Sequence, residues 1–459
     1  MCAEYVSIDL YMPDPDQVSN AAVSTPVATG HPVAARTAGA AAFESRDFRR
    51  YQMARLLVIL GAEAQAIAVA WQVYQITHSA LDLGYTGLAL FLPGLFFMLA
   101  AGHAADRYDR RMVVLVCYGL QTLCTGALFW LAWTGTHSIM PIYAVLFVIG
   151  MGRAFSGPAS SALVPHLVPE RHFVNAVTWG ATIFQTANIA GPALGGLLFT
   201  LPLVGPLQRF HHFQGAPLVF LATMASLIAY IGLVGSLSVR PGRMEKRGFS
   251  TKTLLAGLHY VWHNNLVLGS ISLDLFAVLL GGAVALMPIF AEEILHAGPR
   301  GLGLLRAMPA IGALMISLSL TWKPIHRHAG ALMFTCVGIF GAATVLFGLS
   351  KSIPVSLAAL FFIGASDMIS VVIRSSLLQL ATPPEMRGRV SAVNSVFVGA
   401  SNEFGEFESG LTAHWWGAVR AVVVGGVGSL VVTGLWSVLF PTLRRTNELE
   451  SSSLMSKRS

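Results

Sequence analysis

Nine ionisable side chains stand inside otherwise apolar stretches of the sequence, and their types could support chemistry there. The nine are Glu63, Arg153, Asp274, Arg306, Asp367, Arg374, Glu403, Glu406 and Glu408. A charged side chain is costly in hydrocarbon, so each should face water or a partner of opposite charge. A carboxylate at this depth that binds and releases a proton is neutral in one state and charged in the other. Such residues suit the coupling of proton movement to another process.

The acidic side chains are densest near residue 405. Asn402, Glu403 and Glu406 cluster because positions three apart share a helix face. Glu408 is turned about 140° from Glu403 at about 100° per residue. We predict that the proton-coupling group is among five acids, with three arginines as intramembrane counter-ions. The acids are Glu63, Asp274, Asp367, Glu403 and Glu406, and the arginines are Arg153, Arg306 and Arg374.

Two alternatives remain open for these charges. Asp367 and Arg374 lie two turns apart on one helix face and could pair with each other through water. More generally, the acids and arginines could form interhelical ion pairs that only hold the structure together.

Twelve apolar stretches position these side chains, and their lengths fit a lipid bilayer. A hydrocarbon core about 30 Å thick is crossed by about 20 helical residues, whose backbone must form its hydrogen bonds within the helix. Only 11% of the 459 residues are charged and 54% are hydrophobic, against about 25% charged in soluble proteins. We predict an all-α membrane protein. Its spans are approximately 52–76, 80–103, 112–133, 139–163, 175–200, 217–238, 266–291, 301–322, 330–349, 354–380, 391–413 and 418–440.

The longest connection divides the chain into two pseudo-symmetric bundles of six helices. A repeat at an offset of 215 residues supports this division, because Ser160-Ser161-Ala162-Leu163 reappears as Ser375-Ser376-Leu377-Leu378 and Pro169-Glu170 as Pro384-Glu385. Repetition after six spans preserves their direction, as in a parallel duplication. Coincidence in a chain rich in Ala, Leu and Ser is the alternative. The expected parts are a disordered cytoplasmic tail (1–47), bundles at 48–238 and 265–443, a cytoplasmic linker (239–264) and a cytoplasmic tail (444–459).

The basic residues predict the orientation. Most Lys and Arg lie near one set of span ends, whereas the opposite loops hold only Arg209, Arg300, Lys351 and Arg420. Because Lys and Arg are enriched on the cytoplasmic side, both termini should be cytoplasmic. This placement also explains the net charge of +7 without a nucleic-acid partner.

Other classes of chemistry lack their signatures. The cysteines Cys2, Cys117, Cys124 and Cys336 form no CxxC pair, and three lie in apolar spans, so we expect no disulfide, metal site or cofactor. No GxxxxGK[ST] loop is present, so ATP is not expected to drive the protein directly. The histidines are dispersed and no GxSxG occurs, which argues against a membrane-embedded enzyme.

The loop between the second and third spans has a recognisable pattern. Residues 102–111 read Gly-His-Ala-Ala-Asp-Arg-Tyr-Asp-Arg-Arg, which resembles the loop signature of the major facilitator superfamily. Asp109 stands where that signature more often has Gly, and Ala104 where it has Leu. Three further stretches resemble a branch of efflux proteins typified by enterobactin and macrolide exporters. They are Arg-Ala-Phe-Ser-Gly-Pro at 153–158, Gly-Pro-Ala-Leu-Gly-Gly at 191–196 and Leu-Arg-Ala-Met-Pro at 305–309, and the resemblance runs from about 48 to 443.

The resemblance implies that the loop is a conformational gate whose contacts break and reform as the two halves rock. Its members are Gly102, Asp106, Arg107, Asp109, Arg110 and Arg111. On electrostatic grounds, Asp106 could lie at the N-terminus of the eleventh span, near 389–391, and interact with the helix dipole. The alternative is a solvated basic loop that only sets topology. The equivalent loop at 323–328 lacks the acid, so we expect such a clasp on one side only.

The resemblance also implies that spans 1, 4, 7 and 10 surround a central cavity, with spans 3, 6, 9 and 12 outside. The charges agree, because spans 3, 6 and 9 carry none and span 12 has only Arg420 near its rim. In span 5, Gly191, Pro192, Gly195 and Gly196 should permit close helix packing. In exporters of this family a related motif occurs, which favours outward transport, although tight packing alone would also explain these residues.

Together these features predict a secondary active transporter that works by alternating access. The favoured function is proton-coupled efflux of a hydrophobic or amphiphilic small molecule, such as a drug, macrolide or siderophore. A mover of lysophospholipids or other lipids, or an importer of the same fold, is the alternative within transport. A membrane sensor or assembly partner is the alternative outside it. The expected partners are the substrate, protons and the lipid bilayer, and the expected state is a monomer. The resemblance to bacterial efflux proteins implies that the membrane is a plasma membrane, here a bacterial inner membrane.

Overall fold

Every regular element that the structure describes is helical. The computed structural model describes residues 42–161, 163–169, 172–201, 214–238, 251–323, 325 and 328–446. Ten of its helical segments are long and apolar enough to cross a bilayer, judged by length and composition. Two further long helices, α5 (Phe173–Phe199) and α13 (Pro384–Trp416), are not among these ten segments. The all-α membrane fold predicted from the sequence is confirmed.

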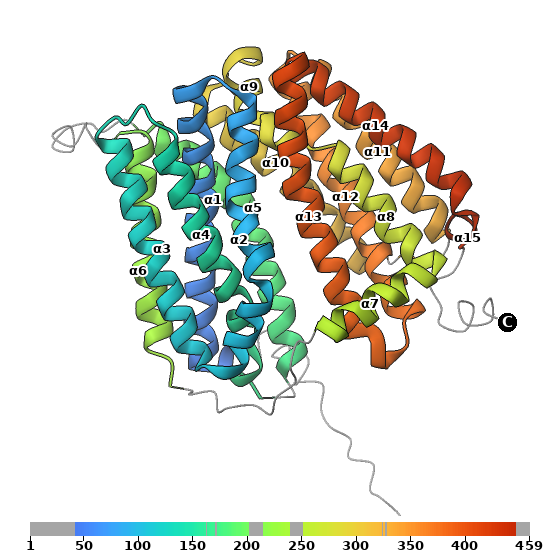
Figure 1. Ribbon diagram of the computed structural model, residues 1–459, viewed down its shortest axis with the longest axis horizontal. Helices are drawn as coiled ribbons and strands as arrows, with labels where there is room; N and C mark the ends of the chain where they lie inside the picture. The colour runs from blue at the N-terminus through green and yellow to red at the C-terminus, as the bar shows by residue number, and fades with distance from the viewer. Residues whose placement is uncertain are drawn as a thin grey trace, which may run out of the picture. The chain divides into compact units, whose positions relative to one another are not determined.

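The long helices form two bundles that follow each other along the chain (Figure 1). The first contains α1 (Arg46–Thr77), α2 (Ala80–Arg107), α3 (Arg110–Trp133), α4 (Met140–Ser161), α5 and α6 (Ala216–Gly235). The second contains α8 (Asn265–Leu280), α10 (Gly298–Trp322), α11 (Ala329–Leu349), α12 (Ile353–Ala381), α13 and α14 (Ala418–Leu439). A shorter helix, α7 (Thr251–His263), precedes the second bundle, and α15 (Pro441–Arg444) follows it.

Equivalent helices pack in equivalent pairs. In the first bundle α1 packs on α5 and α6, α2 on α4, and α3 on α4 and α6. In the second bundle α8 packs on α13 and α14, α10 on α12, and α11 on α12 and α14. The same correspondence holds between bundles, where α5 packs on α10 and α2 packs on α13. The packing is therefore pseudo-symmetric, as the offset repeat predicted.

The seventh span is interrupted. Helix α8 ends at Leu280, and after Gly281 and Gly282 the chain continues as η6 (Ala283–Leu286), α9 (Met287–Ile289) and the π-helix η7 (Phe290–Ile294). A Cβ on Gly282 would lie 2.6 Å from the carbonyl oxygen of Gly405 and 2.7 Å from Ser409 Oγ. Glycine at this position therefore lets the broken segment lie directly against α13.

The two bundles meet through small residues. A Cβ on Gly196 of α5 would lie 2.6 Å from the carbonyl oxygen of Pro299, and one on Gly303 of α10 would lie 2.6 Å from that of Pro192. A Cβ on Gly410 of α13 would similarly lie 3.1 Å from Gly84 Cα on α2. Such backbone proximity is what small residues allow where membrane helices cross.

These contacts occupy one end of the helices and stop near the middle. Along α2 and α13 they run from Gly84 to Phe91, whose ring lies 5.6 Å from that of Phe404. The next small residues on the same two faces are Gly94 and Gly399, and a Cβ on either would have no atom within 4 Å. The bundles are thus joined at the ends that lie next to the predicted outer loops, and they diverge toward the other ends.

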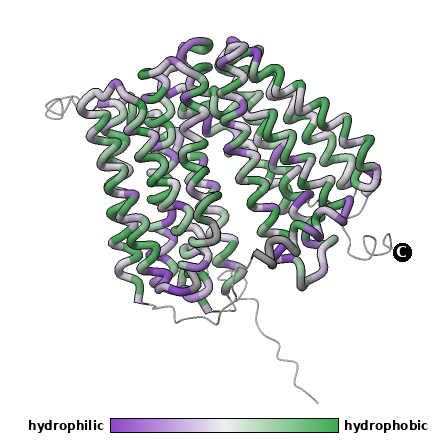
Figure 2. The backbone as a smooth tube through the Cα atoms, viewed as in Figure 1, coloured by the Kyte–Doolittle hydropathy of each residue, from purple (hydrophilic) through white to green (hydrophobic). Residues whose placement is uncertain are grey.

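The surfaces expected to face lipid are apolar. Large hydrophobic side chains are exposed on α3, α6, α11 and α14, including Leu123, Ile228, Leu346 and Val438. Figure 2 shows hydrophobic residues along the outer helices of both bundles. This agrees with the prediction that spans 3, 6, 9 and 12 lie outside.

Three boundaries differ from the prediction. Residues 42–47, assigned to a disordered tail, form a 3₁₀ turn and the start of α1; the Ala42 N–H donates to Asn175 Oδ1 (3.1 Å), and Ser45 caps α1. Within the expected linker, α7 is held by a hydrogen bond of 2.7 Å from Tyr260 Oη to the Ala381 carbonyl. Residues 1–41, 239–250 and 447–459 lie outside the described residues.

The third difference concerns α13, which begins at Pro384 rather than near 391. Proline is favoured at the first helical position, because its missing N–H would have no intrahelical partner there. The helix N-terminus that was expected near 389–391 is therefore five or more residues earlier, and 389–391 lie inside the helix.

We predict that Gly196→Ala destabilises the protein by about 1–3 kcal/mol, because the added methyl group must displace backbone on α10. A fall in the thermal unfolding temperature of the purified protein would show this. Gly232→Ala on α6 is the matched control, since a Cβ there has no atom within 4 Å. Equal unfolding temperatures for the two variants would contradict the close-approach role of Gly196.

Candidate functional site

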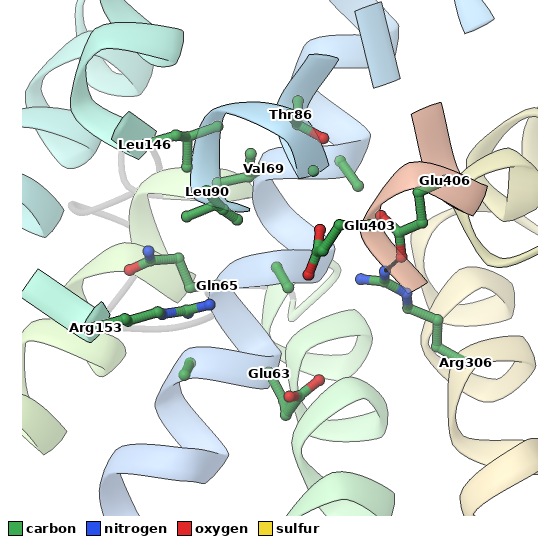
Figure 3. Close-up of a pocket in the computed structure, with 14 residues that line it drawn as sticks. Glu63, Gln65, Val69, Thr86, Leu90, Leu146, Arg153, Arg306, Glu403 and Glu406 are labelled. Carbon is green, nitrogen blue, oxygen red and sulfur yellow. Dashed lines mark ion pairs between the residues drawn. The ribbon is translucent and has the colours of Figure 1, made fainter. Parts of the chain in front are cut away.

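Five of the nine ionisable residues meet at one cavity. Glu63 of α1, Arg153 of α4, Arg306 of α10, and Glu403 and Glu406 of α13 line a space of about 210 Å³ (Figure 3). Its lining comes from helices of both bundles. Helical spacing explains the contribution of α1, whose lining residues Ala62, Glu63, Ala66, Val69 and Ala70 share one face. We call this space the interbundle cavity.

The two glutamates of α13 lie against α2 at a position without a side chain. A Cβ on Gly87 would lie 3.0 Å from Glu406 Oε2 and 3.1 Å from Glu403 Oε2. Glu406 Oε1 is 3.9 Å from Arg306 Nη2, as the dashed line in Figure 3 marks. Glu403 makes no direct ion pair within the described part of the chain, although both Arg153 and Arg306 act on it electrostatically. One carboxylate is thus directly compensated and its neighbour is not.

A second cavity lies within the second bundle, on the other side of α13. It has a volume of about 380 Å³ and shares Glu403 and Glu406 with the interbundle cavity. Asp367 of α12 and Asn402 are its other strongly polar lining residues, and its walls are otherwise mostly apolar. We call it the second-bundle cavity. Helix α13 therefore presents the same two carboxylates to two spaces.

The remaining acid and arginine form a buried pair. Arg374 Nη1 donates to Asp274 Oδ2, joining α12 to α8, and each residue is only 4% exposed. The partner of Arg374 is thus Asp274, and no direct pair joins Arg374 to Asp367. Asp367 lies within electrostatic reach of both residues of the pair. Glu408 lines neither cavity, as its rotation on the helix predicted.

The loop after α2 makes its described contacts inside the first bundle. Asp109 caps α3 by accepting from the N–H groups of Arg111 (2.8 Å) and Met112 (3.4 Å). Arg111 in turn donates to the carbonyl oxygens of Leu237 (2.9 Å) and Gly235 at the end of α6. Asp109 therefore caps α3 with side-chain hydrogen bonds that the commoner glycine could not form.

Two other members of the proposed gate, Arg110 and Arg107, lie close to Asp109 in the sequence. Arg110 Nη1 lies 3.3 Å from His166 Nε2, again in the first bundle, and Arg107 is exposed. The side chain of Asp106, on which the electrostatic argument rested, lies outside the described residues. The gate role of Gly102, Asp106, Arg107, Asp109, Arg110 and Arg111 stays a prediction.

Sequence reasoning missed the polar links between the bundles, two of which are formed by side chains at span ends. Tyr74 Oη, at the end of α1, donates to Glu293 in η7. Arg300 Nε donates to Thr200 Oγ1 (2.5 Å), joining the start of α10 to the end of α5. Polar residues at span ends are common, so their types alone gave no signal of pairing. Both links lie at the joined ends of the bundles.

Helices α2 and α1 contribute further lining residues to the interbundle cavity. Thr86, Gly87 and Leu90 line the interbundle cavity, whereas Phe91, Phe96 and Phe97 line neither cavity. Gln65 of α1 lines it, and its Oε1 accepts from Thr125 Oγ1 (2.9 Å). Spans 1, 4, 7 and 10 each line one of the two cavities, and Phe340 is a lining residue from span 9, which was expected to lie outside.

Comparison with known proteins gives consistent matches over most of the chain. A family model described as transmembrane secretion effector matches residues 37–458. The enterobactin exporter EntS of Citrobacter koseri is 26% identical over 408 residues, covering 87% of this chain and 92% of the relative. The enterobactin exporter EntS of Escherichia coli O1:K1 is 25% identical over 395 residues, covering 84% and 86%.

Solved structures resemble the fold at low identity. A bacterial homologue of the human lysosomal transporter Spinster, inward-facing and unoccupied, aligns with a TM-score of 0.66 at 14% identity, covering 90% of this chain and 98% of that one. A bacterial homologue of the iron transporter ferroportin, also inward-facing, aligns with a TM-score of 0.64 at 17% identity, covering 87% and 99%. These likenesses concern the fold alone.

The buried Asp274–Arg374 pair generates a stability prediction. Asp274→Asn leaves a buried guanidinium without its counter-charge, and we expect a loss of about 3–5 kcal/mol. The double variant Asp274→Leu with Arg374→Met removes both charges and should recover most of the loss, as measured by thermal unfolding in detergent. A single variant as stable as the parent would contradict this. If the double variant is stable but inactive in transport, the pair has a role beyond holding α8 to α12.

Proposed function

The chain belongs to the transmembrane secretion effector family of the major facilitator superfamily and is a multi-pass membrane transporter, and from this premise we propose that it exports a small molecule in exchange for protons. The proposed substrate is hydrophobic or amphiphilic, as a drug, macrolide or siderophore is. The observation that carries the proposal is the pair Glu403 and Glu406, which lies between two cavities and has one direct arginine partner.

Electrostatics supports proton coupling at this pair. Two carboxylates close together in a site of low dielectric repel each other, and a bound proton or a cation relieves that repulsion. Arg306 compensates Glu406, which leaves Glu403 as the acid whose charge depends most on what occupies the cavities. A cargo that binds more tightly when Glu403 is negatively charged then competes with proton binding at Glu403. Glu63 faces the same cavity, and Asp367 faces the second one.

The contacts between the bundles support alternating access. The bundles are joined at one end by glycine-rich crossings and by the Tyr74–Glu293 and Arg300–Thr200 links. With both termini placed in the cytoplasm, this end faces outward and the diverging end faces the cytoplasm. The proposed cycle breaks these links to release cargo outside. Export also agrees with the function of the relatives described above, which are named as enterobactin exporters.

Inverted membrane vesicles with an imposed proton gradient test the coupling. Glu403→Gln should lose most of its proton-driven transport, because the side chain can no longer alternate between charged and neutral states. Glu63→Gln, Asp274→Asn, Asp367→Asn and Glu406→Gln complete the set, with a compound panel that includes a macrolide and enterobactin. Glu408→Gln is the control, since this residue lies on the same helix but lines neither cavity.

The direction of transport is read in the same vesicles. Uptake into their lumen with proton release from it corresponds to export from cells, whereas the opposite fluxes would indicate an importer of the same fold. Full activity in all five variants would end the proposal that these acids carry the proton.

A cross-link tests the cycle independently of the acids. With the four native cysteines replaced, Thr200→Cys and Arg300→Cys place two thiols where the side chains now form a hydrogen bond. A short bifunctional reagent that joins the two thiols through disulfide bonds should hold α5 to α10 and stop transport completely. A reductant, which cleaves these disulfide bonds, should restore transport. The two single-cysteine variants treated in the same way are the controls. Continued transport by the cross-linked protein would mean that this end does not open.

A further inference from the structure

We infer that the second-bundle cavity is a binding site for a lipophilic organic cation, whose apolar body lies on the cavity wall and whose charge lies beside Asp367 and Glu403. This inference rests on the proposed function and names the class of cargo. It selects positively charged compounds from the hydrophobic and amphiphilic molecules considered above.

The size and the walls of the cavity suit an organic molecule. Its volume of about 380 Å³ lies within the range of about 300–1,000 Å³ that is usual for small-molecule pockets. Met287, Phe340, Leu360 and Ile363 contribute large apolar side chains to its lining. A bare metal ion or sodium ion would leave this apolar surface unused, whereas an aromatic or aliphatic body would cover it.

The charges of the lining have one sign. Among the described residues that line this cavity, the ionisable ones are Asp367, Glu403 and Glu406, all of them acids. Arg306 is paired with Glu406 at 3.9 Å. Asp367 and Glu403 accept no hydrogen bond and form no direct ion pair within the part of the chain that the structure describes. Two carboxylates from two different helices are therefore available to a ligand.

The broken seventh span adds a second, independent source of negative potential. Helix α8 ends at Leu280, and Val278, Gly281 and Gly282 at this end line the cavity. The last carbonyl groups of a helix have no intrahelical partners and carry the negative end of its dipole. Interrupted membrane helices use such ends to hold cations. An anion of the same size would meet both the carboxylates and this helix end.

The apolar and acidic parts are arranged so that one molecule reaches both. Ile363, Gly364 and Asp367 lie on α12 at positions that share a helix face, so the wall continues into the carboxylate. Asn402, Glu403 and Glu406 approach from α13. Because Glu403 and Glu406 also face the interbundle cavity, a bound cation lies next to the acids that are proposed to take up the proton.

Two probes of matched shape and opposite charge test the inference. Tetraphenylphosphonium and tetraphenylborate are added separately to the purified full-length protein in detergent, without any proton gradient, and equilibrium binding is measured. The phosphonium should bind saturably and the borate should not. Asp367→Asn and Glu403→Gln should each weaken phosphonium binding by about tenfold or more, since each removes one nearby charge. Ile363→Trp should abolish binding by filling the cavity while leaving both carboxylates in place.

Glu408→Gln is the control and should bind the phosphonium as the parent does, and thermal unfolding of every variant establishes that it is folded. The inference is overturned if the phosphonium does not bind saturably, if the borate binds equally well, or if Asp367→Asn, Glu403→Gln and Ile363→Trp all bind as the parent does. Binding is measured without flux, so it can be judged separately from transport in vesicles. If the phosphonium binds as expected but the vesicles show no transport, the cation site is supported and the proposed export is wrong. If the vesicles transport cargo but the phosphonium does not bind in this pattern, the proposed export is supported and the cation site is wrong.

Discussion

The structure depends on the cost of placing a charged side chain in hydrocarbon. That cost requires each ionised group within a span to face a partner or water, and the helices are arranged accordingly. Six of the nine groups line the two cavities, and two more form the Asp274–Arg374 pair. Helices α3, α6, α11 and α14, which carry none of them, present large apolar side chains outward. Each helix that carries one of the nine groups lines a cavity, and so does α2, which carries none of them, whereas α3, α6 and α14 line neither cavity.

Close backbone approach is the second requirement, and glycine meets it at the crossings between bundles. At Gly196 and Gly303 the facing backbones are so near that any side chain would collide with a carbonyl oxygen. At Gly87 the absent side chain instead makes room for two carboxylates from α13. The same residue type therefore serves packing at both crossings and, at Gly87, also makes room for the charged site. Since the crossings end near the middle of the helices, the two bundles contact each other over one part of their length only.

The sequence was sufficient for those features that follow from hydropathy and helical period. It predicted the all-α fold, the charged spans and the rotation that takes Glu408 away from Glu403. It did not predict that Arg374 pairs with Asp274, which is 100 residues away, because Asp367 on its own helix was an equally reasonable partner. Which acid an arginine meets depends on the rotation and depth of two packed helices. The start of α13 was missed for a simpler reason, since the charged residues between Pro384 and Arg389 made its first turns look like a loop.

Helix α13 is where the two requirements meet, and it is not among the ten described helical segments that are apolar enough by composition to cross a bilayer. It packs on α2 of the other bundle and on α8 of its own, so its charged face is enclosed by protein on both sides. Glu403 and Glu406 can therefore face two cavities while Arg306 directly compensates only one of them. A change in the charge of Glu403 alters the electrostatic energy of both cavities at once. Movement of α13 relative to α2 would change the surroundings of the same carboxylate, and in this way a single side chain connects the packing of the two bundles to the electrostatics of both cavities.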